Sequence, residues 1–135
     1  MKNLLFLLSV LLVSVSFGQT AEEYKNQGNA KYDLQDYRGA ILDYNKAIEL
    51  DPTNVKAYNN RGMAKANANL QDYRGAILDF TKAIELDPTT DAIPYYNRGL
   101  AKYALSNIDG ACLDWSKAGE LGYGDAYEYI KKYCN

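Results

Sequence analysis

The sequence contains no histidine, and this absence excludes a large part of enzyme chemistry. Ser–His and Cys–His nucleophilic sites and imidazole metal sites cannot be built from this chain alone. The two cysteines, Cys112 and Cys134, lie too far apart in the sequence for metal-ligand spacing. No glycine-rich phosphate loop occurs, because the recurring Arg-Gly and Gly-Ala pairs lie within expected helices. We therefore expect no enzyme activity, no cofactor and no metal.

The chain also lacks a strongly basic segment. It has 15 Lys and Arg residues against 17 Asp and Glu residues, a formal net charge of −2. A mildly acidic chain without a basic run is a poor ligand for polyanionic phosphate backbones. We therefore expect a protein or peptide partner and no nucleic acid.

Long apolar runs are missing except near the N-terminus, between Leu4 and Val15. Lys2 precedes this run, and the small residues Ser16 and Gly18 follow it, a pattern typical of a cleavable secretory signal. A membrane anchor is the alternative, but the run is short and lacks basic residues on its far side. We predict a signal peptide at 1–18, cleaved before Gln19. The mature chain, 19–135, is then exported to a periplasm or the extracellular space, with no membrane span.

Two segments of the chain are nearly identical. Residues 34–54 and 70–90 share 18 of 21 aligned residues at an offset of 36, and 95–121 form a weaker third copy. A fixed period of this length marks a repeat array, in which each unit buries its apolar face against its neighbours. Within each copy, apolar residues at i, i+3, i+4 and i+7 predict a helix, and Asp51-Pro52 ends the helix of the first copy.

The periodicity predicts two helices per repeat and no strands. The expected helices cover 21–34, 37–50, 55–68, 73–86, 92–105 and 108–121, followed by a capping helix over 125–133. The repeats then cover about 21–54, 55–90 and 92–124. Tyr44, Phe80 and Trp115 should be buried between the helices of their own repeats. The recurring glycines Gly28, Gly62 and Gly99 lower helix propensity, so we expect close helix packing to compensate.

This pattern resembles the tetratricopeptide repeat family, whose unit of about 34 residues places aromatic, small and proline residues at fixed positions. The matching residues are Tyr24, Gly28, Ala40, Tyr44, Ala47 and Pro52, then Tyr58, Gly62, Ala76, Phe80, Ala83 and Pro88, then Tyr95, Gly99, Ala111, Trp115 and Ala118. In the third repeat, Gly122-Tyr123 replaces the proline. The resemblance implies an all-α fold of three antiparallel helix-pair repeats, stacked as a short right-handed solenoid with a C-terminal capping helix.

Two departures from the family pattern recur in the first helices. Lys31, Lys65 and Lys102 stand where an aromatic residue is usual, and Gln27, Arg61 and Arg98 stand where leucine is usual. Their apolar stems can pack while their polar ends reach solvent or the recurring carboxylates Asp43, Asp79 and Asp114. The alternative is a set of exposed ion pairs with little effect on stability.

The resemblance also implies a concave, peptide-binding groove lined by the first helices. The expected site residues are Lys25, Asn26, Asn29, Asn59, Asn60, Met63, Tyr96, Asn97, Leu100 and Tyr103. Further groove positions are Glu22, Tyr32, Asp33, Lys56, Ala66, Asn67, Ile93 and Ala104. Asn26, Asn60 and Asn97 occupy equivalent positions, and a row of carboxamides could pair with the backbone of an extended peptide. The alternative is that each asparagine bonds a neighbouring helix.

Cochaperones of this family grip a C-terminal carboxylate with lysine, arginine and asparagine side chains. Lys25, Asn29 and Asn60 match three of these positions, but Ile93 and Asn97 occupy the other two. Without those cations most of the charge-assisted bonding is lost, so we do not expect this clamp. We expect an exported adaptor that binds a peptide or partner surface in the groove. The alternative is a non-catalytic structural subunit of an envelope or secretion assembly, held through its convex face and cap.

The two cysteines are expected to form a disulfide. Cys112 lies ten residues before Gly122, where the last repeat helix turns into the cap, and Cys134 lies twelve residues after it. Two antiparallel helices of equal rise per residue bring such positions level. The alternative is a pair of buried free thiols, since unpaired cysteine is often buried.

Overall fold

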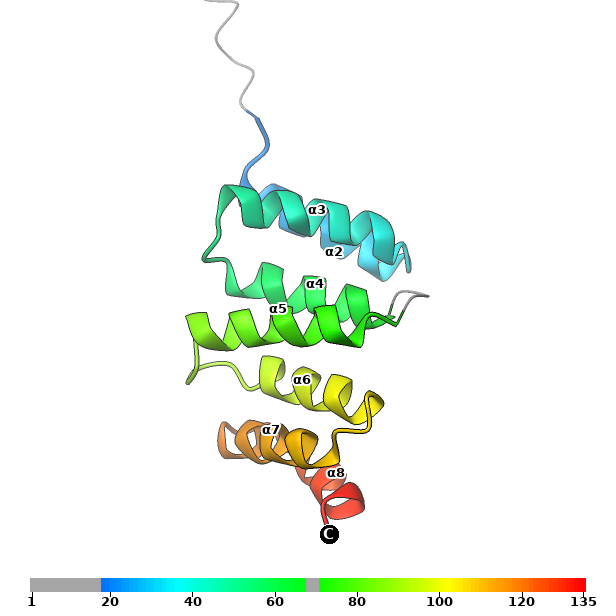
Figure 1. Cartoon of the computed structure of the whole chain (residues 1–135). Coiled ribbons are helices and arrows are strands. Elements are labelled where there is room, and N and C mark those ends of the chain that lie inside the picture. The colour runs from blue at the N-terminus through cyan, green and yellow to red at the C-terminus, as the bar shows by residue number, and fades with distance from the viewer. Residues whose placement is uncertain (1–17, 68–70) are drawn as a thin grey trace, which may run out of the picture.

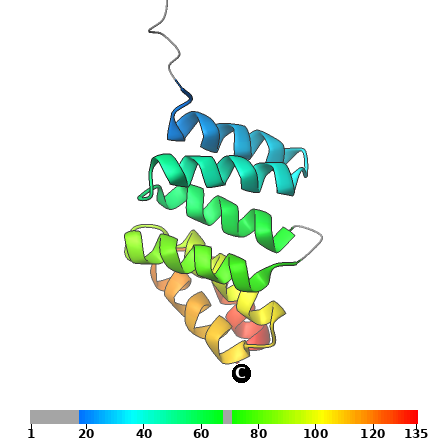
Figure 2. The ribbon, with the colours of Figure 1, turned by 45° about the horizontal axis from the view of Figure 1, so that its top comes forward.

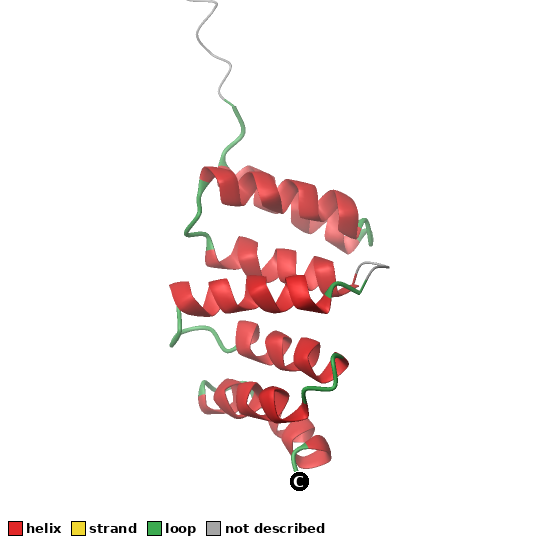
Figure 3. Ribbon diagram, viewed as in Figure 1, coloured by secondary structure: helices red, strands yellow, loops and turns green. Residues whose placement is uncertain are grey.

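The helix boundaries follow the predicted periodicity. The structure, a computed structural model, describes residues 18–67 and 71–135, and these form helices joined by loops, without a strand (Figure 3). The helices are α2 (Ala21–Asp33), α3 (Tyr37–Leu50), α4 (Val55–Asn67), α5 (Tyr73–Leu86), α6 (Ile93–Ala104), α7 (Ile108–Glu120) and α8 (Ala126–Tyr133). Each described boundary lies within one residue of the prediction. The signal predicted for residues 1–18 lies outside the described part, apart from Gly18.

The helices pair in chain order and the pairs stack into a solenoid. α2 packs on α3, α4 on α5 and α6 on α7, and each pair also packs on the next (Figures 1 and 2). α2 further contacts α4, and α4 contacts α6, so the first helices approach one another along one side of the stack. We call this side, formed by α2, α4 and α6, the concave groove.

Side-chain caps fix where the helices begin. Thr20 and Glu23 form a reciprocal capping box at the start of α2, which satisfies two backbone N–H groups that have no partner within the helix. Asp36, Asp72 and Asn107 cap α3, α5 and α7 by accepting from the backbone N–H three residues later. α3 ends at Leu50, directly before Asp51-Pro52, as predicted.

The predicted aromatic residues fill the space within each helix pair. Tyr44, Phe80 and Trp115 are at most 1% exposed, which confirms their placement. An added Cβ at Gly62 would lie 2.7 Å from the Phe80 ring, and Gly28 and Gly99 approach Tyr44 and Trp115 equally closely. Glycine is therefore present because the ring of the second helix lies directly against the backbone of the first.

A buried ionic cluster recurs in the second and third repeats. Both carboxylate oxygens of Asp79 accept hydrogen bonds from Arg61, at 2.6 and 3.0 Å. Asp79 also pairs with Lys65 at 2.9 Å. The third repeat repeats this arrangement with Asp114, Arg98 and Lys102. Since the side chains of both aspartates are only 5% exposed, these are not solvent-exposed surface pairs.

The arginines of these clusters also join neighbouring repeats. Arg61 Nη1 donates to Asn45 of α3 at 2.9 Å, and Arg98 Nη1 donates to Thr81 of α5 at 3.1 Å. The first repeat lacks such a residue, because Gln27 stands at the equivalent position and no earlier repeat is described. The arginines therefore bind the second helix of their own repeat and that of the preceding repeat.

The short helix α8 closes the array against α7. The structure joins Cys112 of α7 to Cys134 by a disulfide, with Cα atoms 5.7 Å apart. Tyr129 of α8 lies 5.1 Å from the Trp115 ring, measured between ring centroids. The cap thus covers the last repeat with aromatic side chains and a covalent link.

Candidate functional site

Two adjoining pockets lie along the concave groove. The first, of about 320 Å³, lies between α2 and α4 and is lined by Asn29, Tyr32, Asp33, Tyr44, Asn60 and Met63. The second, of about 310 Å³, lies between α4 and α6 and is lined by Met63, Ala66, Asn67, Tyr73, Phe80, Asn97, Leu100, Ala101 and Ala104. Met63 borders both pockets, so they adjoin at this side chain. The first pocket is mainly polar and aromatic, and the second mainly apolar.

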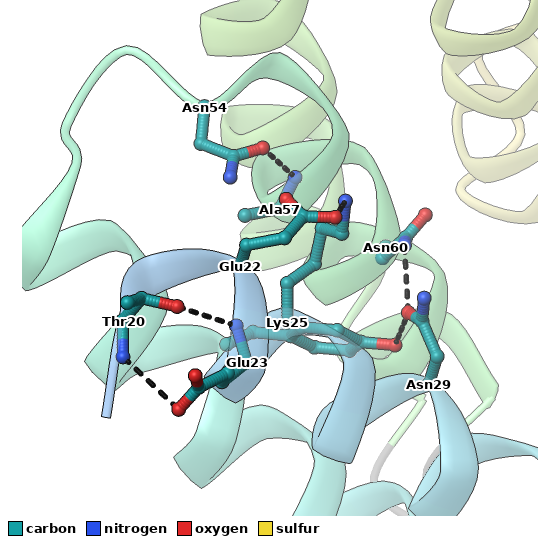
Figure 4. A network of polar contacts seen from close by, with 9 residues as sticks. Thr20, Glu22, Glu23, Lys25, Asn29, Asn54, Ala57 and Asn60 are labelled. Carbon is teal, nitrogen blue, oxygen red and sulfur yellow. Dashed lines mark hydrogen bonds and ion pairs between the residues drawn. The ribbon is translucent and has the colours of Figure 1, made fainter.

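Asn29 organises the floor of the first pocket. Its Oδ1 accepts from the Tyr44 hydroxyl at 2.8 Å and from Asn60 Nδ2 at 2.9 Å, and Figure 4 shows Asn29 and Asn60 facing each other. Burial raises the pKa of the Tyr44 phenol well above its usual range, so this hydroxyl keeps its proton and donates. Asn29 therefore ties α2 to both α3 and α4, and the pocket is formed before any ligand arrives.

The wall of the first pocket is held by Asn67. Its Nδ2 donates to the Tyr32 hydroxyl and to the Met63 carbonyl, both at 2.9 Å. These bonds fix the Tyr32 side chain of α2 against the end of α4. Tyr32 and Asn67 were implied groove positions, and the structure brings them together.

Lys25 has its charge neutralised within its own helix. Its Nζ lies 2.6 Å from Glu22 Oε1, and only 11% of its side chain is exposed (Figure 4). A lysine so placed has a counter-ion already, which weakens its attraction for an incoming carboxylate. Lys25 is therefore less suited to a carboxylate clamp, and the expectation that none operates here stays a prediction.

Two of the three equivalent asparagines, Asn60 and Asn97, form hydrogen bonds to a neighbouring helix. Asn60 donates to Asn29, and Asn97 donates to Asn59 Oδ1 at 3.2 Å, so both bond the first helix of the preceding repeat. For Asn60 and Asn97 this matches the alternative, in which the asparagine bonds a neighbouring helix. Asn26 is exposed. Within the described residues, Oδ1 of Asn60 and of Asn97 accepts no side-chain or backbone hydrogen bond, so each amide keeps an acceptor for a ligand.

Two expected groove residues pack against the cap. The Tyr96 ring lies 4.6 Å from that of Tyr123 and 5.5 Å from that of Tyr129, and Tyr103 lies 4.5 Å from Tyr133. The cap α8 thus contacts α6, the first helix of the third repeat, as the first helix of a further repeat would. Tyr96 and Tyr103 thus pack on the cap and its preceding turn. Leu100 and Asn97 line the second pocket.

Three lining residues escaped the sequence analysis because they come from second helices. Tyr44 reaches the first pocket from α3, and Tyr73 and Phe80 reach the second from α5. The family pattern marks two of them only as core aromatics. The hydroxyl of Tyr44, which Phe80 and Trp115 lack at the equivalent positions, was the available signal for a polar role.

Two further features are absent from the described part of the chain. No group of three or more Cys, Asp or Glu side chains there is placed to hold a metal ion. None of the described helices is both long and apolar enough to cross a membrane.

Family models match the repeats directly. Residues 28–69 match a model described as TPR repeat, and residues 55–90 match one described as Tetratricopeptide repeat. DnaJ homolog subfamily C member 7 of Mus musculus is 34% identical over 106 residues, which cover 78% of this chain and 21% of that protein. Protein STIP1 homolog of Dictyostelium discoideum is 48% identical over 46 residues, 34% of this chain and 8% of that protein. This chain spans a small part of each relative's length.

Solved domains share the fold over most of the chain. The first TPR of Spaghetti (RPAP3) bound to HSP90 peptide SRMEEVD superposes with a TM-score of 0.80 at 28% identity, covering 86% of this chain and 91% of that one. The second TPR domain of human RPAP3, in complex with HSP70 peptide SGPTIEEVD, gives 0.78 at 29% identity, covering 85% and 95%. The second TPR of Spaghetti, bound to the HSP90 peptide, is 31% identical and is covered over 93% of its length, with a TM-score of 0.71.

Proposed function

This chain belongs to the tetratricopeptide repeat family, and we propose that it is a non-catalytic adaptor whose concave groove binds an extended peptide of a partner protein. The observation that carries the proposal is the pair of adjoining pockets along α2, α4 and α6. The peptides bound by the similar RPAP3 domains support the same use of the fold here. We do not transfer the peptides of those domains to this chain, because its groove residues differ from the clamp expected of cochaperones.

The groove offers hydrogen-bonding groups suited to an extended backbone. The free Oδ1 atoms of Asn60 and Asn97 can accept from peptide N–H groups, and Asn29 Nδ2 can donate to a peptide carbonyl. Backbone pairing of this kind supplies affinity independent of sequence, and the pockets between the asparagines supply preference for particular side chains.

Peptide selection followed by NMR mapping tests the groove. Peptides are selected from a random heptapeptide display library on the mature protein, and the best one is titrated into isotope-labelled protein. We expect amide shifts along α2, α4 and α6, including the side-chain amides of Asn60 and Asn97. Shifts confined to α3, α5 and α7 would refute groove binding.

A pair of matched variants sharpens this test. Asn60→Leu and Asn97→Leu keep a similar side-chain volume but remove the free Oδ1 acceptor, so peptide affinity should fall about tenfold or more. Lys46→Ala on α3 removes an exposed side chain whose ion pair with Glu49 is solvent-accessible, and it should leave affinity unchanged. Thermal unfolding of each variant separates lost binding from lost folding.

A second candidate function rests on the opposite face. Leu42, Leu78 and Leu113 occupy equivalent positions of α3, α5 and α7 and are 66%, 72% and 73% exposed. Recurring exposed leucines favour a structural subunit that contacts an assembly through its second helices. Replacing all three with asparagine should then release the protein from its native assembly, measured by gel filtration of cell extracts. If the assembly keeps its size while groove variants lose peptide, this second function is excluded.

We also propose that the protein is exported after cleavage before Gln19. The support is the sequence alone: a basic start, an apolar run and small residues before the expected cut. Intact mass and N-terminal sequencing of the protein from cell fractions measure this directly. A mature N-terminus at Gln19 in the exported fraction is expected, and a full-length protein starting at Met1 in the cytosol would contradict it.

A further inference from the structure

We propose that the first pocket of the groove selects a lysine or arginine side chain of the bound peptide. This inference rests on the proposed peptide-binding function and adds the chemical class of one ligand side chain. It concerns the space of about 320 Å³ between α2 and α4, at the small end of the range for ligand pockets. Such a volume suits one long side chain.

Among the described residues that line this pocket, Asp33 is the one that carries a charge. It is exposed at the end of α2, and no basic side chain of the described residues pairs with it. The nearby lysines of the first two repeats have other partners: Lys25 pairs with Glu22, Lys31 with Asp43 and Lys65 with Asp79. The pocket therefore presents a carboxylate whose counter-ion the described chain does not supply.

The remaining lining suits an organic cation. Tyr32 and Tyr44 supply aromatic surface, which attracts ammonium and guanidinium groups, and Met63 supplies a polarisable wall for an alkyl stem. The hydroxyl hydrogen of Tyr44 is committed to Asn29, so the phenol oxygen is left as an acceptor. Asn60 Oδ1 is a second acceptor in the same pocket. A lysine or arginine has donors only and matches these groups.

The electrostatics of the two tyrosines agree with this geometry. Burial raises the pKa of the Tyr44 phenol, with smaller contributions from Tyr32 and then from the Asp33 carboxylate. Burial is also the main cause that raises the pKa of the Tyr32 phenol, followed by Tyr37 and, to a smaller extent, by Asp33. The negative charge of Asp33 is thus felt at both rings, and a bound cation would be stabilised by the same field.

The charge of this pocket differs from what acidic peptides require. The peptides held by the RPAP3 domains, SRMEEVD and SGPTIEEVD, each carry three acidic side chains near their C-terminus. In the present chain the first pocket carries the Asp33 carboxylate, which pairs with no basic side chain of residues 18–67 and 71–135, and Lys25 already has a carboxylate partner. Ile93 and Asn97 add no positive charge in the third repeat. An acidic peptide meets repulsion at Asp33, whereas a basic side chain meets attraction.

Parallel peptide selections test the inference. A random, end-capped heptapeptide library is selected on the mature wild-type protein, on Asp33→Asn, and on Glu85→Gln, which removes one exposed carboxylate from α5 and serves as the charge-matched control. Asp33→Asn should fold normally, because it removes a negative charge from a helix C-terminus, where such a charge is unfavourable. We expect one peptide position to be enriched in lysine or arginine with wild type and Glu85→Gln, and this enrichment to disappear with Asp33→Asn.

Binding of the best selected peptide then measures the pairing. Replacing its basic residue with norleucine should weaken binding to wild type about tenfold and binding to Asp33→Asn less than twofold. Equal loss in both proteins would overturn the assignment to Asp33. Selected peptides without a basic residue, or tighter binding of SRMEEVD, would overturn the inference while leaving groove binding intact. Failure to enrich any peptide on the wild-type protein would overturn both the inference and the proposed function.

Discussion

At the scale of single residues, the positions that matter most are those where backbone and ring meet. Gly62 shows this most simply. A Cβ there would lie 2.7 Å from Phe80 Cε1 and 3.0 Å from Cδ1, closer than carbon atoms pack. Phe80 is 1% exposed, so its ring can yield only by shifting toward the second pocket and losing its packing between α4 and α5. The usual advantage of alanine within a helix, about 1 kcal/mol, is therefore outweighed by overpacking.

We accordingly expect Gly62→Ala to lower the free energy of unfolding by about 1–3 kcal/mol. Denaturant unfolding followed by circular dichroism measures the change. Ala64→Gly, at a buried position of the same helix, is the reverse exchange and a control for helix propensity. If Gly62→Ala proves as stable as wild type, the close approach to Phe80 is not as tight as the structure indicates.

A second residue-scale feature lies in the turn between the helices of each repeat. Gln35 and Ser106 have φ of 61° and 63°, in the left-handed region that side chains with a Cβ rarely adopt. Glycine occupies this region without that penalty. Gln35→Gly should therefore stabilise the protein by about 1 kcal/mol, measured as a higher denaturant midpoint at an unchanged slope. A lower midpoint would mean that the Gln35 side chain makes contacts that outweigh the strain.

At the scale of elements, the cap α8 depends on the disulfide for its position. Cys112 and Cys134 are 22 residues apart, and α8 has only eight residues, too few for an isolated helix to be stable in water. Linking a loop of this size stabilises the fold by about 3 kcal/mol in the chain-entropy account. The sequence predicted the pairing from the antiparallel spacing of the two residues, without any contact information.

The double variant Cys112→Ser/Cys134→Ser should lose about that 3 kcal/mol and lose amide protection first in α8. Hydrogen exchange read by mass spectrometry locates the loss. Alkylation without reduction, applied to protein from its native compartment, checks whether the bond forms there. Two alkylated cysteines, or unchanged protection of α8 in the double variant, would contradict this role.

The first repeat also differs from the others at the element scale. Asp43 pairs only with Lys31, at 2.8 Å, whereas Asp79 and Asp114 each bind an arginine through both oxygens as well as a lysine. Asp43 Oδ2 forms no further hydrogen bond among the described residues. The difference follows from Gln27, which stands where the other repeats have arginine.

Gln27→Arg should complete the missing cluster and stabilise the protein by about 1 kcal/mol. Gln27→Met controls for the apolar stem without the charge, and the gain is expected only for arginine. Chemical denaturation of the three proteins side by side measures it. An equal gain for both variants would assign the effect to packing of the stem and not to Asp43.

At the scale of the whole molecule, the order and limits of the repeat helices could be predicted from the sequence, but the groove only in part. Helix limits follow from local signals such as the apolar period before Asp51-Pro52, so the predicted boundaries hold to within one residue. The contacts of four groove residues depend on which side chains face them from a neighbouring repeat or the cap, and no local sequence pattern encodes this. These residues are Asn60, Asn97, Tyr96 and Tyr103. The asparagines bond the preceding helix, and the tyrosines pack on the cap.

The same scale governs how the repeats unfold together. In a repeat array, cooperativity arises from the interfaces between neighbouring units. Arg61 lies at the interface of the first two repeats, where it holds Asp79 through two bonds and reaches Asn45 of the first repeat at 2.9 Å. Removing it leaves Lys65 as the only ionic partner of Asp79 within the described residues, and it also removes a bond between repeats.

We therefore expect Arg61→Met to cost about 3–5 kcal/mol, because a buried charge loses its main partner. The weakened interface should also let the first repeat open separately, which lowers the denaturant slope and broadens the transition. Arg61→Met/Asp79→Leu removes both charges and should recover most of the stability but not the link to Asn45. A single sharp transition in Arg61→Met, with the wild-type slope, would show that apolar packing alone couples the first two repeats.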